Sequence, residues 1–348
     1  VTTGTSNTLI GGLAGDAITT GSQNTATGYL ALSADTTGSQ NTAYGRSSLV
    51  SNTTGANNTA SGYASLASNT TGNYNTASGM YSLYVNSTAS NNTAMGYESL
   101  KANTTGANNV AVGATAGLAL TTGSQNVLIG EKAGDALTTA SDNVVMGRSA
   151  LGSDTLGSKS VAIGRSALFT QNFTSATDTY NTAVGYGAGL SVTTGLRNTI
   201  IGGLAGDALT DADNNVALGY NALGADTLGS ANVAVGQGTL QAQNFTSATT
   251  SYNTAMGHQA GNQVTTGTVN TLVGGLAGDA LTSGNSNVAL GYGSLSSDTT
   301  GDRSTALGFQ ALAVQNFTSN TDTYNTAVGY NAGVAVTTGV QNTLVGGL

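Results

Sequence analysis

A five-residue phrase of polar and apolar positions recurs along the whole chain. Asn181, Thr182, Ala183, Val184 and Gly185 form one copy: an Asn, then Thr or Val, a small or aliphatic residue, usually an apolar residue, and a Gly. The 20 copies follow at a step of 17, except for three steps of 21, and they begin at residues 7, 24, 41, 58, 75, 92, 109, 126, 143, 160, 181, 198, 215, 232, 253, 270, 287, 304, 325 and 342. A fixed period of this length indicates a repeat architecture, in which each unit contacts mainly its neighbours.

The positions within the repeat predict its local structure. With the Asn as position 1, position 2 is Thr or Val and position 5 is Gly in all 20 copies, and positions 13–15 commonly read Thr-Thr-Gly. β-branched residues at a fixed place favour a strand. The glycines at positions 5 and 15, Gly11 and Gly21 in the first copy, fit corners where φ is positive or another backbone comes close. The repeat therefore predicts a short strand, a Gly turn, a second short segment and a Thr-Gly turn.

A coil of this length is too short for a two-helix repeat and suits one turn of a β-solenoid. The predicted fold is all-β, a parallel β-solenoid or β-roll in which like residues stack from coil to coil. Residues 1–348 would form one continuous array of about 20 coils, roughly 95 Å long at about 4.8 Å per coil. The Asn at position 1, present in 18 of the 20 copies, is expected to form a hydrogen-bonded ladder like the stacked amides of cross-β structures.

The two faces of the predicted strand decide how the coils are covered. Positions 2 and 4 share one face and position 3 takes the other. Both faces are apolar or nearly so, although Thr27, Tyr44, Ser61 and Ser78 interrupt position 4 in the early copies. A single-chain solenoid has one interior, so we expect further copies of the chain to cover the other face. The result would be a closed homo-oligomer with the small Ala of position 3 at its centre. The alternative is that Ala at position 3 is tolerated on the outside.

A longer, 72-residue period begins at about residue 109, and it contains the 21-residue steps. The inserted residues fall in near-identical segments at 171–180, 243–252 and 315–324, which we expect to bulge from the array as loops. Exposed loops on a rigid scaffold are where binding residues collect. The candidate surface-binding residues are the aromatic residues of these loops: Phe173, Tyr180, Phe245, Tyr252, Phe317 and Tyr324. The alternative, which we favour, is that the rings pack each bulge onto its own coil.

The composition argues against several functional classes. The formal net charge is −8 with only 8 Lys and Arg residues, so no basic patch for nucleic acid is apparent. No apolar run approaches the roughly 18 residues of a membrane span. The chain has no Cys and one His, His258, so neither a transition-metal cluster nor a nucleophile–base pair is visible. Asp207, Asp211 and Asp213 cluster as calcium ligands do, but this cluster occurs once. We therefore predict no enzyme activity, no cofactor and no metal site.

Two copies of the phrase carry a resemblance to a known family. The segments 109–113, Asn-Val-Ala-Val-Gly, and 160–164, Ser-Val-Ala-Ile-Gly, resemble repeats in the heads of trimeric autotransporter adhesins, the YadA-like left-handed parallel β-roll. The 17-residue step with Thr-Thr-Gly is also similar to the shafts of phage tail fibres and related bacterial fibre proteins. The resemblance covers essentially the whole chain, although the coil of the adhesin head is shorter. It implies a homotrimer that is exposed outside the cell or on a virion.

Three functions compete for such a chain. The repetition, the low charge and the lack of catalytic groups favour a structural role: the shaft or head of a trimeric fibre, extracellular or virion-associated. Such a fibre is a rigid spacer and an adhesin for a receptor, glycan or matrix. The alternative is a single-chain Thr-rich solenoid that binds ice or another regular surface. An enzyme carried on a β-helix would need acids or bases that depart from the repeat. Neither end of the sequence differs from the repeat as a cap would, so we expect an excerpt of a longer fibre.

Burial of position 3 yields a direct test. Replacing Ala183 with Asp should bury an unpaired charge and lower the free energy of unfolding by several kcal/mol. Thermal or denaturant unfolding of the variant and the wild type measures this loss. A variant that melts like the wild type would contradict the burial of position 3.

Overall fold

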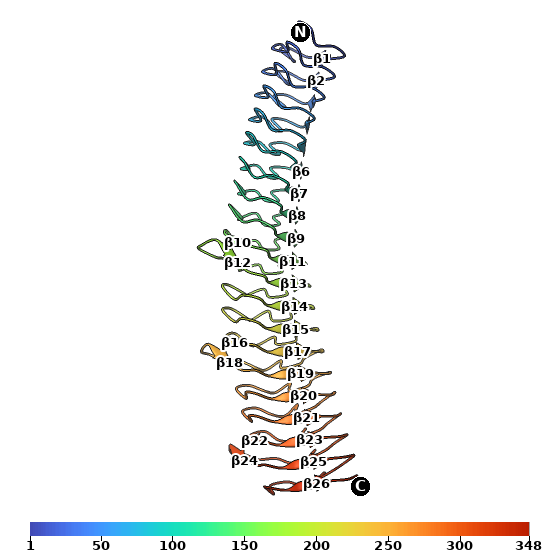
Figure 1. Ribbon diagram of the computed structural model, residues 1–348, viewed down its shortest axis with the longest axis vertical. Coiled ribbons are helices and arrows are strands. Elements are labelled where there is room, and N and C mark those ends of the chain that lie inside the picture. The colour runs from blue at the N-terminus through green and yellow to red at the C-terminus, as the bar shows by residue number, and fades with distance from the viewer. Residues whose placement is uncertain (348) are drawn as a thin grey trace. The chain divides into compact units, whose positions relative to one another are not determined.

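The computed structural model describes residues 1–347, which form strands, turns and bends and no helix. The chain divides into two compact units: unit 1 is Val1–Thr179, and unit 2 begins at Tyr180. Each unit is a parallel β-solenoid in which every coil contributes one three-residue strand to a ladder (Figure 1). Among residues 1–347 no helix has the length and apolar character needed to cross a membrane.

The strands of the two main ladders coincide with the repeated phrase. In unit 1 they are β1 (Thr8–Ile10), β2 (Thr25–Thr27), β3 (Thr42–Tyr44), β4 (Thr59–Ser61), β5 (Thr76–Ser78), β6 (Thr93–Met95), β7 (Val110–Val112), β8 (Val127–Ile129), β9 (Val144–Met146) and β11 (Val161–Ile163). In unit 2 they are β13 (Thr182–Val184), β14 (Thr199–Ile201), β15 (Val216–Leu218), β17 (Val233–Val235), β19 (Thr254–Met256), β20 (Thr271–Val273), β21 (Val288–Leu290), β23 (Thr305–Leu307), β25 (Thr326–Val328) and β26 (Thr343–Val345). Two-residue strands form three separate parallel pairs: β10 (Gly157–Ser158) with β12 (Thr177–Asp178), β16 (Gly229–Ser230) with β18 (Thr249–Thr250), and β22 (Gly301–Asp302) with β24 (Thr321–Asp322).

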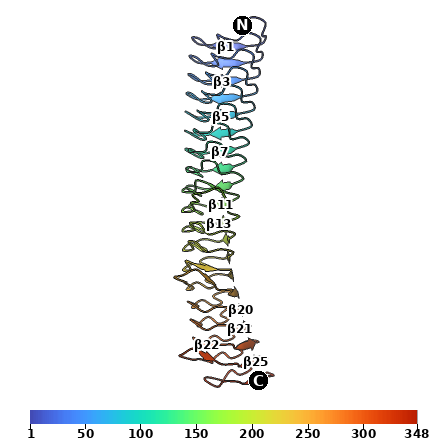
Figure 2. The ribbon, with the colours of Figure 1, turned by 60° about the vertical axis from the view of Figure 1, so that its left-hand side comes forward.

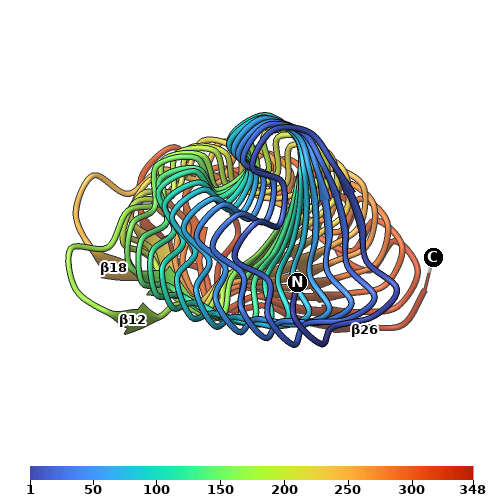
Figure 3. The same cartoon turned by 90° about the horizontal axis from the view of Figure 1, so that it is seen from above.

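Neighbouring strands pair in parallel with each repeat position opposite itself. Thr8 lies opposite Thr25 and Leu9 opposite Ala26 in unit 1, and the same register recurs from strand to strand in unit 2. Figure 2 shows the strands of unit 1 lying one above another, and in Figure 3 the successive coils of unit 1 (blue to green) trace similar paths. The predicted parallel β-solenoid, with one coil for each copy of the repeat, is confirmed.

The strand directs position 3 inward and positions 2 and 4 outward. Ala183 and Ile200 are fully buried, whereas Val184 is half-buried and Thr199 is exposed. Position 3 therefore lies in the core that each chain builds for itself. Its predicted place at the centre of an oligomer is wrong, and so is the alternative of an outer Ala. The loss of stability expected for Ala183→Asp still holds, but it concerns the chain's own core and reports nothing about assembly.

Two kinds of coil fill this core in complementary ways. In a Leu coil, position 9 is Leu and position 12 is a buried Asp, Asn or Gln, as in Leu32 and Asp35. In a Gly coil, position 9 is Gly and position 12 is Ile, Leu or Val, as in Gly134 and Leu137. A Cβ on Gly134 would lie 2.8 Å from Leu137 Cδ1 and 3.0 Å from Cδ2 of Leu128, the residue at position 3. In this coil the larger side chains at positions 3 and 12 thus occupy the space that Leu of position 9 fills elsewhere. Where a Gly coil has Ala at position 3, as in the coil of Gly117, Leu100 and Leu128 of the neighbouring coils reach into that space.

Close approach between coils fixes the corner glycines. Gly28, at position 5, has a φ of 138°, and a Cβ on it would lie 2.6 Å from the carbonyl of Gly45 in the next coil. At position 15 a Cβ on Gly21 would meet the carbonyl oxygen of Gly38. Both predicted corners are confirmed. The sequence did not reveal the positive φ of non-Gly residues such as Leu32 (φ 54°), whose backbone strain of about 1–3 kcal/mol is outweighed by core packing.

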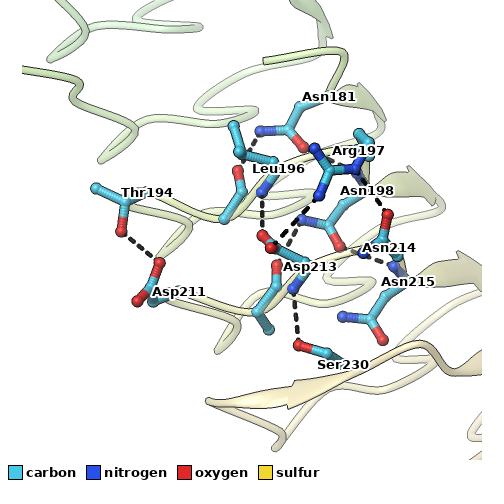
Figure 4. Close-up of polar contacts among 12 residues, drawn as sticks. Asn181, Thr194, Leu196, Arg197, Asn198, Asp211, Asp213, Asn214, Asn215 and Ser230 are labelled. Carbon is cyan, nitrogen blue, oxygen red and sulfur yellow. Dashed lines mark hydrogen bonds and ion pairs between the residues drawn. The ribbon is translucent and has the colours of Figure 1, made fainter. Parts of the chain in front are cut away.

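The Asn at position 1 forms the predicted ladder between coils. Asn181 Oδ1 accepts the backbone N–H of Asn198 at 2.9 Å, and Asn198 Nδ2 donates to the carbonyl oxygen of Ala212 at 2.7 Å (Figure 4). Asn215 repeats this arrangement in the following coil. These amides are buried, so a missing partner would leave an unsatisfied polar group. The ladder therefore fixes the register of each coil on the next.

A double-mutant cycle in one Gly coil tests the core complementarity. Leu128→Ala should cost about 2–5 kcal/mol by leaving a cavity, and Gly134→Leu about 1–3 kcal/mol by overfilling the core. In the double variant the new Leu enters the vacated space, so the measured loss should fall below the sum by about 1 kcal/mol or more in denaturant unfolding. The matched control combines Leu128→Ala with Gly278→Leu, a Gly of the same kind in unit 2, where the losses should add. Additive losses in the first pair would contradict the complementarity.

Candidate binding surfaces

The three predicted bulges lie where the sequence placed them, but their aromatic residues divide into two groups. The phenylalanines are buried: Phe173 is 6% exposed, and Phe245 and Phe317 are 7% exposed. The tyrosines Tyr180, Tyr252 and Tyr324 are 55%, 62% and 51% exposed. The packing interpretation therefore holds for the phenylalanines, and the exposed aromatic surface of the bulges belongs to the tyrosines. Figure 1 shows the pairs β10·β12, β16·β18 and β22·β24, which flank the bulges, set apart from the main ladders.

A buried carboxylate anchors each bulge to the coil before it. In the second bulge Asp226 Oδ1 accepts the backbone N–H groups of Gly229 at 3.0 Å and of Phe245 at 3.2 Å, and Oδ2 accepts Gln243 Nε2 at 2.6 Å. Asp154 and Asp298 hold the other two bulges through equivalent bonds. The Asp–Gln pair fills position 12 of two successive Leu coils, so the bulge is tied to the core of its unit.

The exposed surface beside the tyrosines varies between bulges. In the third, Arg303 forms an ion pair with Asp322, donates to Tyr324 Oη at 3.0 Å, and places its guanidinium carbon 5.5 Å from the centre of the Tyr324 ring. Asp322 also raises the pKa of Arg303. In the first, Lys159 lies 2.6 Å from Asp178. The second bulge has uncharged residues at both places, Ala231 and Thr250. The two charges are thus present or absent together.

A second surface is the outward face of the main ladders, formed by positions 2 and 4 of the strands, which we call the outer stripe. In unit 2 position 4 is aliphatic in all ten strands, from Val184, Ile201, Leu218, Val235 and Met256 to Val273, Leu290, Leu307, Val328 and Val345. In unit 1 strands β2–β5 carry hydroxyl groups at both positions: Thr25, Thr27, Thr42, Tyr44, Thr59, Ser61, Thr76 and Ser78. Strands β7, β8, β9 and β11 of the same ladder (below, β7–β11 without β10) are apolar at both: Val110, Val112, Val127, Ile129, Val144, Met146, Val161 and Ile163.

Aromatic residues at position 6 line the edge of the outer stripe. Tyr292, Phe309 and Tyr330 stack in successive coils with ring centroids 5.6 Å and 5.2 Å apart and interplanar angles of 17° and 8°. In unit 1 the guanidinium of Arg46 lies 5.8 Å and 5.9 Å from the ring centres of Tyr29 and Tyr63. The rings therefore cover one another or hold a cation on part of their faces, while Tyr292 and Tyr330 remain 51% and 59% exposed.

The stacked threonines form two files with different roles. At position 13 the hydroxyl donates to the next coil, as from Thr36 Oγ1 to the carbonyl oxygen of Thr53 at 3.0 Å. At position 14 the residue is an exposed Thr in eight successive coils of unit 1: Thr20, Thr37, Thr54, Thr71, Thr88, Thr105, Thr122 and Thr139. Asn172, Asn244 and Asn316 replace Thr at position 13 in the bulged coils and accept a hydroxyl of the preceding coil. Of these two files, only that of position 14 is free to meet an external surface. Position 2 adds a further run of exposed threonines in unit 1: Thr8, Thr25, Thr42, Thr59 and Thr76.

The acidic cluster at Asp207, Asp211 and Asp213 is divided among separate partners. Figure 4 shows Asp211 accepting the Thr194 hydroxyl, at 2.7 Å, and Asp213 accepting the Leu196 N–H, also at 2.7 Å. Burial raises the pKa of Asp207. Within residues 1–347 no three His, Cys, Asp or Glu side chains come close enough to hold a metal ion. His258 is exposed at position 6.

One buried carboxyl has an incomplete set of partners. Asp35 opens a file of position-12 amides in unit 1 that continues through Asn52, Asn69, Asn86 and Asn103, each donating Nδ2 to the preceding side-chain oxygen at 2.8–3.2 Å. Asp35 Oδ1 accepts the Asn52 amide and the backbone N–H of Gly38, while Oδ2 is buried without a hydrogen bond. Desolvation by burial raises the pKa of Asp35 to about 7.

Comparison with known proteins adds no assignment to these surfaces. No protein-family model matches the chain, and no curated protein is similar to it. The functional conclusion therefore depends on the geometry of the solenoid and the chemistry of its surfaces.

The Asp35 carboxyl predicts a pH dependence of stability. Its pKa is higher in the folded chain than the ordinary value of 3.8. The stability it contributes is therefore complete below about pH 4 and is lost as the pH rises towards 7. The loss amounts to about 4 kcal/mol at most, at about 1.4 kcal/mol per pH unit. Asp35→Asn should continue the amide file, melt at a higher temperature than the wild type at pH 8, and lose this advantage near pH 4.

Thermal unfolding followed by circular dichroism between pH 4 and pH 8 measures this difference. The matched control is Asp142→Asn, which removes an exposed carboxylate from the same unit and should leave the pH profile of the wild type unchanged. An Asp35→Asn profile parallel to that of the wild type would refute the assignment.

Proposed function

We propose that this chain is a shaft segment of a homotrimeric fibre, extracellular or carried on a virion, that serves as a rigid spacer and presents adhesive surfaces along its sides. The observation that carries the proposal is the continuous stacking of equivalent positions within each unit. Strand hydrogen bonds, buried Asn amides and position-13 hydroxyls all join one coil to the next. Such repeated neighbour-to-neighbour contacts suit a mechanical support better than a catalytic cavity.

The bulges favour a role in adhesion to a host receptor, glycan or matrix. Tyr252 and Tyr324 recur at equivalent places on two bulges of unit 2, and each exposes more than half of its surface. Their backbones are held by buried Asp–Gln pairs, so a ligand would meet a preorganised loop. A repeated site of this kind gains avidity when several copies bind the same surface.

A second candidate function is binding of ice or another regular surface by a single chain. The position-14 file of eight exposed threonines in unit 1 favours it, because one hydroxyl and one methyl recur in every coil. The hydroxyls of position 13 do not add a second free file, since they donate to neighbouring coils. The exposed threonines of position 2 end at Thr76, and Val occupies that position from Val110 to Val161. The two Thr files therefore run together over only part of unit 1, and we place this function second.

The mass of the chain in solution decides between the two functions. Light scattering or native mass spectrometry should give three times the chain mass of 34.1 kDa, with a β-rich circular dichroism spectrum. A β-rich monomer would refute the trimeric fibre, and thermal hysteresis of the same sample would then support the ice-binding alternative. A monomer without thermal hysteresis would contradict both functions.

A further inference from the structure

The outer stripe is aliphatic at position 4 throughout unit 2 and apolar at both positions in β7, β8, β9 and β11 of unit 1. Position 2 in unit 2 is Thr in seven strands and Val in three. Leu218, Met256 and Leu290 in unit 2 are 40%, 42% and 49% exposed. Val235 and Val273, in the strands between them, are half-buried, so position 4 presents apolar atoms in consecutive coils. Single exposed apolar residues are ordinary on protein surfaces, but a contiguous file of partly exposed ones marks an interaction surface. No charged residue occupies position 2 or 4 in any strand of the two main ladders. The stripe would therefore be covered at little cost in desolvated charge.

Two groups of strands in unit 1 have the same fold but different outward residues, so they show which outward residues the fold itself requires. Strands β2–β5 and β7–β11 share the same ladder, the same register and the same fully buried position 3, as in Ala43 and Ala111. Thr and Val have nearly the same shape and both favour strands. Hydroxyl-bearing residues at positions 2 and 4 are therefore sufficient to build the strand. The change to Val, Ile and Met in β7, β8, β9 and β11 is therefore not required to form the strand.

A second copy of the chain fits the stripe better than another partner does. A surface with one side chain in every coil, at about 4.8 Å spacing, is matched along its length by a surface with the same spacing. In unit 2 the ten ladder strands present two outward residues each, which reaches the lower end of the roughly 20–30 residues per side of a standard interface. In unit 1 a parallel arrangement pairs apolar with apolar strands, whereas an antiparallel one would set β7–β11 against the hydroxyls of β2–β5.

We propose that copies of this chain pack in parallel through the outer stripe. The apolar contact comprises β7, β8, β9 and β11 in unit 1 and the ladder strands of unit 2. The hydroxyl strands β2–β5, which a parallel arrangement sets opposite their own copies, contribute no apolar contact at position 4. The proposal rests on the proposed trimeric fibre and names the residues that hold it together. Position 3 faces the chain's own core. The residues between copies are therefore those of positions 2 and 4.

Charge placed on the stripe tests the proposal. Ile129→Asp in β8 and Leu290→Asp in β21 should each convert the trimer to monomer in light scattering, because both would bury an unpaired carboxylate in the contact. Since both side chains point out of the chain, the circular dichroism spectrum should not change. Ser61→Asp in β4, the same repeat position on the hydroxyl part, should remain trimeric.

Cysteine cross-linking locates the contact independently, because the chain has no native Cys. In a parallel, in-register assembly equivalent residues of the copies meet along the stripe. Ile129→Cys should therefore give covalent dimers with a short bis-maleimide, and Thr122→Cys, an exposed position-14 residue outside the stripe, should not. Trimers that survive both Asp substitutions, or that cross-link through Thr122→Cys as readily as through Ile129→Cys, would overturn the stripe and leave the fibre intact. A monomeric wild type would overturn the fibre itself, and this inference with it.

Discussion

The structure depends on the stacking of equivalent backbone positions in successive coils. At this distance a side chain at the position-5 corner would collide with the next coil: a Cβ on Gly45 would lie 2.7 Å from the carbonyl oxygen of Gly62. Gly at position 5 is therefore required in each coil that has a following neighbour. The same closeness lets one type of side chain, such as Asn at position 1, bond to its own copy above and below. Repetition of the sequence is thus a direct consequence of the geometry.

Stacking also explains why so much polarity is buried. A buried amide is stable only when its partners are present, and a file of identical amides supplies partners at every step. Where the file ends or changes residue type, a buried polar atom can lack a hydrogen-bond partner. Asp35 lies at such a place, between Ile18 of the preceding coil and Asn52 of the next, and one of its oxygens has no partner. At the bulges the same position is satisfied by an Asp–Gln pair, so the insertion is part of the core.

The outward positions of the coil vary in residue type, whereas the repeat constrains the positions that face the core. Position 3 must remain apolar to fill the coil, whereas positions 2 and 4 change from hydroxyl to aliphatic residues along unit 1 without any change of fold. The charged residues beside the bulge tyrosines likewise differ from one bulge to the next. A scaffold whose interior is fixed by stacking can therefore present different contact chemistry at different coils. This division supports the proposed role as a fibre segment with separate surfaces for assembly and adhesion.

The sequence by itself determined the coil length, the strands, the corner glycines, the Asn ladder and the place of the bulges, because each depends on local geometry repeated at a fixed step. Which face of the strand lies inside depended on the tertiary structure. Alternation identifies two faces but not the side on which the chain closes, so Ala183 was predicted at an interface and lies in the core. The exchange of bulk among positions 3, 9 and 12 and the burial of Phe245 likewise depend on residues brought together only when the coil closes. The sequence shows which residue types occupy these positions, but their contacts form only when the coil closes.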